Sequence, residues 1–138
     1  MTSQIYPINH LKSYKYVVIL STYHGRILLS RHKSRFTWET QGGHIEPGET
    51  PLQAARRELY EESGALSYDI SPLFDYQAED RIGGTCNKAN GMVFHAEIHK
   101  LGSLPHSEMA EVREFDSLPE DLTYPEITPV LFQKYWNH

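Results

Sequence analysis

Short blocks of apolar residues, separated by turn-forming residues, predict several extended strands along the chain. Residues 15–23 predict one strand, and residues 26–30 predict a second after a turn at His24-Gly25. Residues 36–40 and 66–79 predict further extended segments, with a break in the latter near Ser71-Pro72. Residues 92–100 alternate with the period of a strand, which places Met92, Phe94, Ala96 and Ile98 on one face and Val93, His95, Glu97 and His99 on the other.

Residues 51–63 have the sequence features of a helix with both ends marked. Thr50 suits the N-cap, Pro51 suits the first helical position, and Gln53 completes a capping box with Thr50. Gly64 suits the left-handed position just past the helix end. The helical repeat then predicts that Leu52, Ala55 and Leu59 form the stripe that packs on the core.

The rest of the chain predicts a long loop, a helical turn and a closing helix. Gly83-Gly84 and Asn90-Gly91 mark the loop over residues 83–91, and residues 118–122 predict the turn. Residues 127–136 predict the closing helix, with Thr128 and Pro129 near its start. This mixture of strands and helices predicts an α/β or α+β sandwich. The 138 residues suit one domain, which we expect to span residues 1–138.

Composition and charge narrow the classes of partner. The net charge of −5 gives no overall attraction to a nucleic-acid polymer or to an acidic membrane surface. The N-terminal residues lack the pattern of a signal peptide, and no apolar run is long enough to span a bilayer. Cys86 is the single cysteine, which excludes an internal disulfide, so we expect a cytoplasmic protein.

Five glutamates crowd into residues 42–65: Glu46, Glu49, Glu58, Glu61 and Glu62. The last three share one side of the predicted helix, near its C-terminal end, where the helix dipole disfavours anions. No lysine or arginine follows any of the three by three or four residues. A hard divalent cation such as Mg²⁺ would relieve this repulsion, because it binds oxygen ligands. The alternative is an exposed acidic helix end.

Residues around these glutamates fit the pattern G-x5-E-x7-R-E-U-x-E-E-x-G-U, in which U is aliphatic. The matching residues are Gly43, Glu49, Arg57, Glu58, Leu59, Glu61, Glu62, Gly64 and Ala65. This segment resembles the Nudix box, the signature of the Nudix (MutT-like) hydrolases. Two departures are mild: Ala65 is small for its position, and Thr40-Gln41 stands where many relatives have a proline.

The resemblance implies an α/β/α sandwich with a mixed β-sheet, in which the box forms a loop, a helix and a second loop. It implies that Glu58, Glu61 and Glu62 bind Mg²⁺, with Mn²⁺ as the alternative, and that Gly43 belongs to this metal site by allowing the tight loop. Glu61 or Glu62 would also activate water, and Arg57 would orient a glutamate, Glu49. These four residues, Glu49, Arg57, Glu61 and Glu62, are the catalytic residues that the resemblance implies.

The activity implied by the resemblance is hydrolysis of a diphosphate bond in a nucleoside diphosphate linked to a group X. We expect a modified nucleoside triphosphate, cleaved to a monophosphate and pyrophosphate, with a nucleotide sugar or a dinucleotide as the alternative. ADP-ribose-type relatives tend to carry a proline where Arg81 stands, and dinucleoside polyphosphate relatives a tyrosine where Ile82 and Gly83 stand. The expected partner is a small nucleotide, and the expected assembly is a monomer or a homodimer.

Two other classes of function stay open at this point. One is a regulatory Nudix domain that binds a nucleotide without catalysis, although the acidic set is complete. The other is an isomerase of the isopentenyl diphosphate type, which needs a catalytic cysteine, here Cys86.

Several further residues are candidates for chemistry outside the box. Many relatives use an additional acid, for which the candidates are Glu97, Glu108 and Glu111, with Glu108 favoured. The segment from His95 to His99 superficially suggests zinc, but it is not the HExxH motif and strand alternation explains it. A basic cluster could contact phosphate or the X group, and consists of Arg31, His32, Lys33 and Arg35.

Overall fold

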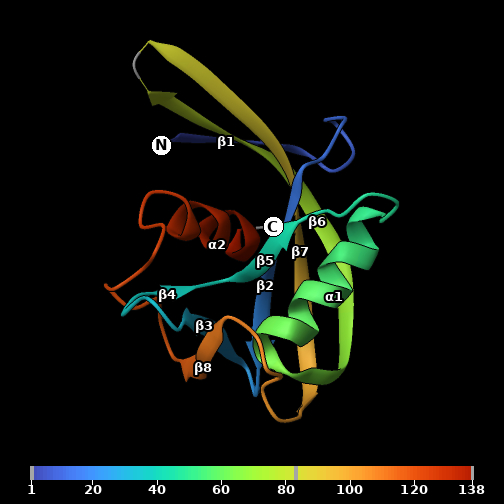
Figure 1. Ribbon diagram of the computed structural model, residues 1–138, viewed down its shortest axis with the longest axis vertical. Coiled ribbons are helices and arrows are strands. Elements are labelled where there is room, and N and C mark those ends of the chain that lie inside the picture. The colour runs from blue at the N-terminus through green and yellow to red at the C-terminus, as the bar shows by residue number, and fades with distance from the viewer. Residues whose placement is uncertain (1, 83, 138) are drawn as a thin grey trace.

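Eight strands form one mixed sheet in the computed structural model, which describes residues 2–82 and 84–137 (Figure 1). The strands are β1 (Thr2–Pro7), β2 (Tyr16–Tyr23), β3 (Arg26–His32), β4 (Trp38–Glu39), β5 (Gln41–His44), β6 (Ala65–Ile82), β7 (Thr85–Leu101) and β8 (Met109–Phe115). They run in the order β1-β6-β7-β2-β3-β4, with β5 paired to β2 and β8 paired to β3. The pairing of β2 with β7 is parallel and the other pairings of named strands are antiparallel.

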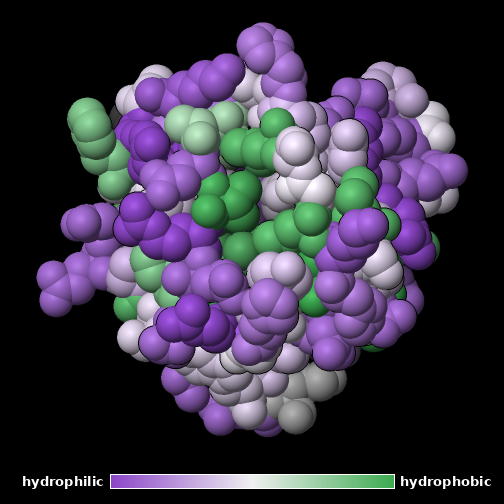
Figure 2. Space-filling model, turned by 90° about the horizontal axis from the view of Figure 1, so that it is seen from below, coloured by the Kyte–Doolittle hydropathy of each residue, from purple (hydrophilic) through white to green (hydrophobic). Residues whose placement is uncertain are grey.

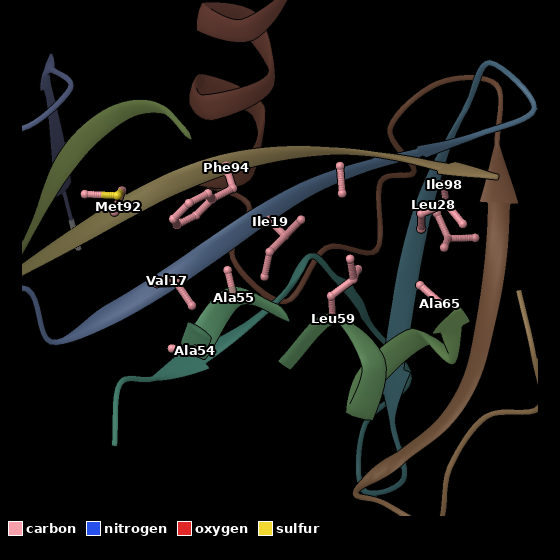
Figure 3. Packing of buried hydrophobic residues seen from close by; sticks show 11 residues of the cluster. Val17, Ile19, Leu28, Ala54, Ala55, Leu59, Ala65, Met92, Phe94 and Ile98 are labelled. Atoms are coloured by element: carbon pink, nitrogen blue, oxygen red, sulfur yellow. The ribbon is translucent and has the colours of Figure 1, made fainter. Parts of the chain in front are cut away.

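Two helices cover opposite faces of this sheet, so the predicted α/β/α sandwich with a mixed sheet is confirmed. Helix α1 (Pro51–Ser63) and helix α2 (Thr128–Trp136) lie on either side of the central strands in Figure 1. Alternate residues of β2 divide between the two cores, with Val17 and Ile19 in the core under α1 and Leu20 in the core with α2. Figure 3 shows Ala54, Ala55 and Leu59 of α1 facing Val17, Ile19 and Phe94.

Helix α1 begins and ends as the sequence predicts. Thr50 accepts a hydrogen bond from the Gln53 amide, and the Gln53 side chain accepts from the Thr50 amide. Gly64 adopts the left-handed conformation, with φ of 78°. The predicted core stripe is wrong at one position, because Leu52 is 41% exposed and Ala54 is fully buried in its place. The face of α1 that packs on the sheet therefore consists of Ala54, Ala55 and Leu59.

The strand predictions hold in the centre of the sheet and fail at its edges. The alternation over residues 92–100 is confirmed, since Met92, Phe94, Ala96 and Ile98 all lie in the core under α1. The predicted loop over residues 83–91 is wrong, because β7 already begins at Thr85 and pairs with β6 over most of its length. The predicted helical turn at residues 118–122 is also wrong, since Leu122 forms a parallel bridge with Trp38. Strands β1 and β8 were not predicted.

The surface is largely hydrophilic around a group of hydrophobic residues. Figure 2 shows such a group in the middle of the face seen from below, bordered by hydrophilic residues. Within the described part of the chain, neither helix is long and apolar enough to cross a membrane.

Candidate active site

Arg57, in the middle of α1, is the centre of the polar cluster that the sequence predicted. Its Nε and Nη2 donate to the two carboxylate oxygens of Glu49 over 2.8 and 2.9 Å, so the expected contact is present. Its Nη1 donates to Oε1 of Glu58 over 2.6 Å and lies 3.5 Å from Oε2 of Glu61. Its Nη2 also donates to the carbonyl of His44, which ties the end of β5 to the helix. The carboxylates therefore do have a basic partner, four residues before Glu61 rather than after it.

Electrostatics of the Arg57–Glu49 pair follow from this geometry. Hydrogen bonds from Arg57, with one from the backbone of the Glu46 segment, lower the pKa of Glu49 to about 2. The same carboxylate raises the pKa of Arg57 further above its ordinary value. Both groups are thus charged at neutral pH, and the pair fixes the loop that precedes α1.

Glu58 occupies a space that exists because residue 43 is glycine. A Cβ atom at Gly43 would lie 2.7 Å from Cδ of Glu58 and 2.8 and 2.9 Å from its two oxygens. Burial raises the pKa of Glu58 above its ordinary value, although Arg57 opposes the shift. Gly43 therefore makes the cradle in which this carboxylate lies beside the β5 backbone.

Glu62 also lies against β5, where it contacts Gly42, the residue before Gly43. Its Oε1 accepts a hydrogen bond of 2.7 Å from the backbone amide of Gly42. Burial raises the pKa of Glu62 to about 8, and negative charge on Glu58, Glu39 and Glu61 adds to the shift. Burial and the neighbouring negative charges thus both favour the neutral form of this carboxyl group.

The contacts of the acidic residues decide whether they fit a divalent cation. Within the described ranges, no three acidic, histidine or cysteine side chains are arranged to hold a metal ion together. Glu58 is bound instead to Arg57, Glu62 is bound to Gly42, and the side chain of Glu61 is 47% exposed. The donors are nonetheless oxygens of the type that Mg²⁺ prefers, in a cradle with an excess of negative charge. The chemistry of these donors therefore fits a hard divalent cation, although Arg57 holds Glu58 in the present arrangement.

A cavity of about 410 Å³ lies next to the segment of β5 that these glutamates contact. Gly42 and Gly43 form part of its wall, and Glu62 and Glu58 lie against these same two residues. Aromatic residues line other parts of it, and Tyr16 meets Tyr76 edge to face with ring centres 5.3 Å apart. The N-terminal part of α2 closes the cavity with Thr128 and Leu131. An apolar cavity of this size lies in the range of small-molecule binding sites.

None of the three candidate acids outside the box has a described contact with Glu58, Glu61 or Glu62. Glu97 is exposed and influences His95 and Tyr135, which belong to the α2 side of the sheet. The side chain of Glu108 is 86% exposed and lies 3.4 Å from His32. Glu111 binds Arg31 and Arg113, which lower its pKa.

Sequence reasoning missed a different acid, Glu39 of β4. Its side chain is 12% exposed, lines the cavity and contributes to the raised pKa of Glu62. It is bound to Arg35 over 3.1 Å and accepts from Thr123 over 3.3 Å. In the sequence, Glu39 stands only three residues before Gly42, and this closeness to the glycine-rich segment was the one available indication of its role. The pairing of strands in the folded sheet is what brings Glu39 towards Glu62.

The remaining candidates outside the box are spread over the surface. Arg31, His32 and Arg35 of the basic cluster are bound to Glu111, Glu108 and Glu39 respectively, and Lys33 is exposed. His95 contacts Thr22 and Tyr135, whereas His99 contacts Asp69, so these histidines are engaged separately. The side chain of Cys86 and the residue Gly83 lie outside the described residues.

Known proteins resemble the chain both in sequence and in structure. The family described as NUDIX domain matches residues 14–131 of the chain. An RNA pyrophosphohydrolase of Francisella philomiragia subsp. philomiragia is 42% identical over 71 residues, which is 47% of this chain and 46% of that protein. The chain thus matches less than half the length of this curated relative.

Solved structures share the fold over nearly the whole chain. A Bacillus subtilis pyrophosphohydrolase has a TM-score of 0.81 at 24% identity, over 98% of this chain and 90% of that one. The NUDIX domain of Shewanella oneidensis NrtR, in a structure with ADP ribose, has a TM-score of 0.69 at 15% identity, over 96% and 92% of the two chains. At these identities the likeness shows the fold alone.

Proposed function

The chain belongs to the NUDIX domain family, and on that premise we propose that it is a Mg²⁺-dependent hydrolase of a diphosphate bond in a nucleoside diphosphate linked to a group X. The observation that carries the proposal is the shared border of the α1 carboxylates and the aromatic cavity at Gly42 and Gly43. A nucleoside in the cavity would bring its phosphates to Glu58, Glu61 and Glu62.

Some of the site residues would bind the cation, and others position the residues that bind it. Glu58, Glu61 and Glu62 would hold the cation, with Mn²⁺ as the alternative to Mg²⁺, and Gly43 keeps the space that Glu58 needs. When bound, the cation supplies neutralisation of phosphate charge and acidifies water. Arg57 holds Glu49 and the loop before α1, so it positions the glutamates rather than touching the substrate.

Proton transfer from the attacking water falls to a carboxylate of the same helix. Glu62 is the proposed acceptor, because the Gly42 amide fixes the orientation of its carboxyl group. Glu61 is the alternative, because its side chain is 47% exposed and therefore more accessible to a substrate. Glu39 is near enough to Glu62 to influence its pKa, but its bonds to Arg35 and Thr123 suit a wall residue of the cavity.

A small nucleotide is the first substrate candidate: a nucleoside triphosphate, plain or modified, giving a monophosphate and pyrophosphate. The cavity supports this choice, because its volume suits a single nucleoside. The 5′ end of an RNA is the second candidate, favoured by the name of the sequence relative. Both substrates place a 5′ polyphosphate at the same carboxylates, and they differ only in the group attached to the 3′ oxygen of the first nucleotide.

The experiment that separates the two candidates compares specificity constants. The purified protein is given GTP, ATP, 8-oxo-dGTP, a nucleotide sugar and a short 5′-triphosphorylated RNA, each with Mg²⁺, and the products are resolved by chromatography. A kcat/KM at least about tenfold higher for the RNA than for the matching free triphosphate would assign the RNA end. A ratio of one or below would assign the free nucleotide. Nucleotide binding without any product would instead support a regulatory binding domain.

A further inference from the structure

Beneath the glutamates of α1, three fully buried polar side chains form a chain of hydrogen bonds. Ser21 of β2, Gln41 of β5 and Ser30 of β3 each have no exposed surface. Ser21 Oγ lies 2.6 Å from Gln41 Oε1, and Gln41 Nε2 lies 2.9 Å from Ser30 Oγ. Ser30 Oγ then lies 2.7 Å from the backbone carbonyl of Glu62. We call these three side chains the relay.

The carbonyl of Glu62, at the end of the relay, fixes the direction of every hydrogen bond in it. A carbonyl oxygen can only accept, so the single hydroxyl proton of Ser30 must point to Glu62. Ser30 then has to accept from Gln41, which places the amide nitrogen of Gln41 on that side and its oxygen towards Ser21. The second amide proton of Gln41 goes to the carbonyl of Leu28, 3.3 Å away. The donors of the relay are therefore all used, which a buried polar network requires.

The relay ends on a backbone group that the helix leaves without a partner. Glu62 is the penultimate residue of α1, and the last four carbonyls of a helix have no intrahelical donor. Ser30 supplies that donor from β3. The residue after Gln41 is Gly42, whose amide donates to the carboxylate of the same Glu62 over 2.7 Å. Two consecutive residues of β5 thus act on Glu62. Gln41 acts on its backbone carbonyl through Ser30, and Gly42 binds its carboxylate directly.

From this geometry we infer that Gln41 and Ser30 are positioning residues for Glu62, and that they fix where its carboxylate lies for cation binding and hydrolysis. The inference rests on the proposed function only for its catalytic part, because the geometry of Glu62 can be measured without turnover. Fixing a carboxylate to a fraction of an ångström matters, since small displacements of a reacting group lower the rate steeply. A hydrophobic residue at position 41 would fill the space but would leave Ser30 free to rotate away from Glu62.

Two buried serines of the relay provide a matched pair of variants. Ser30→Ala removes the donor that contacts Glu62, whereas Ser21→Ala removes the same atom at the far end and leaves the Ser30 contact in place. Both positions lie on neighbouring strands and have no exposed surface, so the two variants lose similar burial. Gln41→Met, which keeps the length of the side chain without its polar atoms, serves as the second relay variant should Ser30→Ala fold poorly.

Three measurements are made on each variant: the exchange rate and chemical shift of the Gly42 amide proton by NMR, the dissociation constant for Mn²⁺ by EPR titration, and kcat and KM separately. For Ser30→Ala and Gln41→Met we expect Gly42 amide exchange to be about 10-fold faster and Mn²⁺ binding about 10-fold weaker, with kcat lowered about 10-fold and KM changed less than about twofold. For Ser21→Ala we expect the Gly42 exchange rate, the Mn²⁺ dissociation constant, kcat and KM each to lie within about threefold of the wild-type value.

The inference is overturned if Ser30→Ala and Ser21→Ala are indistinguishable in Gly42 exchange and in Mn²⁺ affinity, whatever their melting temperatures. The hydrogen bonds of the relay would then only connect β2, β5 and β3, without positioning Glu62. A wild-type protein that turns over no substrate would overturn the proposed hydrolysis instead. In that case the Gly42 and Mn²⁺ measurements still decide whether Gln41 and Ser30 position Glu62.

Discussion

Arg57 donates hydrogen bonds to both carboxylate oxygens of Glu49, with Nε 2.8 Å from one oxygen and Nη2 2.9 Å from the other. The two residues are eight positions apart, on the helix and in the loop that leads to it. The remaining guanidinium nitrogen, Nη1, is directed to Glu58 and lies within 3.5 Å of Glu61. One side chain therefore fixes the loop and two of the acidic residues that we propose as cation ligands.

Arg57→Lys should lower kcat by about 10- to 100-fold, because an ammonium group cannot bind Glu49 through two parallel bonds and also reach Glu58. The measurement is steady-state turnover at saturating Mg²⁺. Arg56→Lys is the matched control, since the neighbouring Arg56 is exposed and contacts only the Tyr68 side chain among the interactions described. Equal rates for the two variants would contradict the positioning role of Arg57.

Gly43→Ala should weaken cation binding with little loss of stability. The added methyl group would lie within 2.9 Å of three atoms of the Glu58 carboxylate, which is the free end of a side chain and can move away. Gly102→Ala is the control, because its methyl group would crowd the end of Leu66 in the same way, away from the glutamates. Melting temperature and Mn²⁺ affinity are measured for both. A drop in affinity shared by both variants would argue against the cradle.

Gly64→Ala should destabilise the fold by about 2 kcal/mol or more, because an L-residue is strained in the left-handed conformation. The φ of Gly64 is 78°, and the added methyl group would lie 2.7 Å from the carbonyl oxygen of Ser103. Gly25→Ala separates the two causes, since Gly25 has a φ of 75° and a methyl group added there would meet nothing within 4 Å. Urea unfolding should give the larger loss for Gly64→Ala. Equal losses of stability in the two variants would mean that the contact with the Ser103 carbonyl adds nothing to the strain of the left-handed conformation.

His95 should make stability fall as the solution becomes acidic. The half-buried ring lies 3.0 Å from Thr22 and 3.1 Å from the hydroxyl of Tyr135, and burial lowers the pKa of His95 below 6.5 although Glu97 opposes the shift. As the pH falls below 6.5, the unfolded chain therefore takes up a proton before the folded chain does, which favours unfolding. Well above pH 6.5 the ring is neutral in both states and the contribution of His95 to stability is complete.

The change that tests this prediction is His95→Gln, followed by thermal unfolding between pH 5 and pH 8. The variant should show a shallower fall in melting temperature below pH 6.5 than the wild type. His99→Gln serves as the control, because His99 is exposed. An unchanged slope in His95→Gln would show that other groups cause the acid dependence.

The parts of the fold that sequence predicts well are those fixed by neighbouring residues. Thr50, Gln53 and Gly64 each act within a few positions of α1, so the helix ends follow directly from local chemistry. The alternation over residues 92–100 likewise predicts a strand with one apolar face, and Met92, Phe94, Ala96 and Ile98 on that face are buried together. The acidic set of the candidate site was also visible, because its members share one helix.

The features that the sequence did not reveal depend on distant pairing. Strand β1 is polar and short, and it exists because β6 supplies its hydrogen bonds. Leu52 had the spacing of a core residue but is 41% exposed, because the face of α1 that packs on the sheet is centred on Ala54, Ala55 and Leu59. Glu39 and the buried Ser21–Gln41–Ser30 relay become visible only when three strands meet.

The most direct test of the proposed function is whether diphosphate hydrolysis requires both a divalent cation and Glu62. The wild type and Glu62→Gln are incubated with a nucleoside triphosphate and with a 5′-triphosphorylated RNA, in Mg²⁺ or in excess chelator, and the phosphorus products are followed by ³¹P NMR. We predict release of pyrophosphate or phosphate by the wild type in Mg²⁺ alone, with the rate lowered at least about 100-fold in Glu62→Gln. Turnover that persists in chelator, or at a wild-type rate in Glu62→Gln, would contradict the proposal.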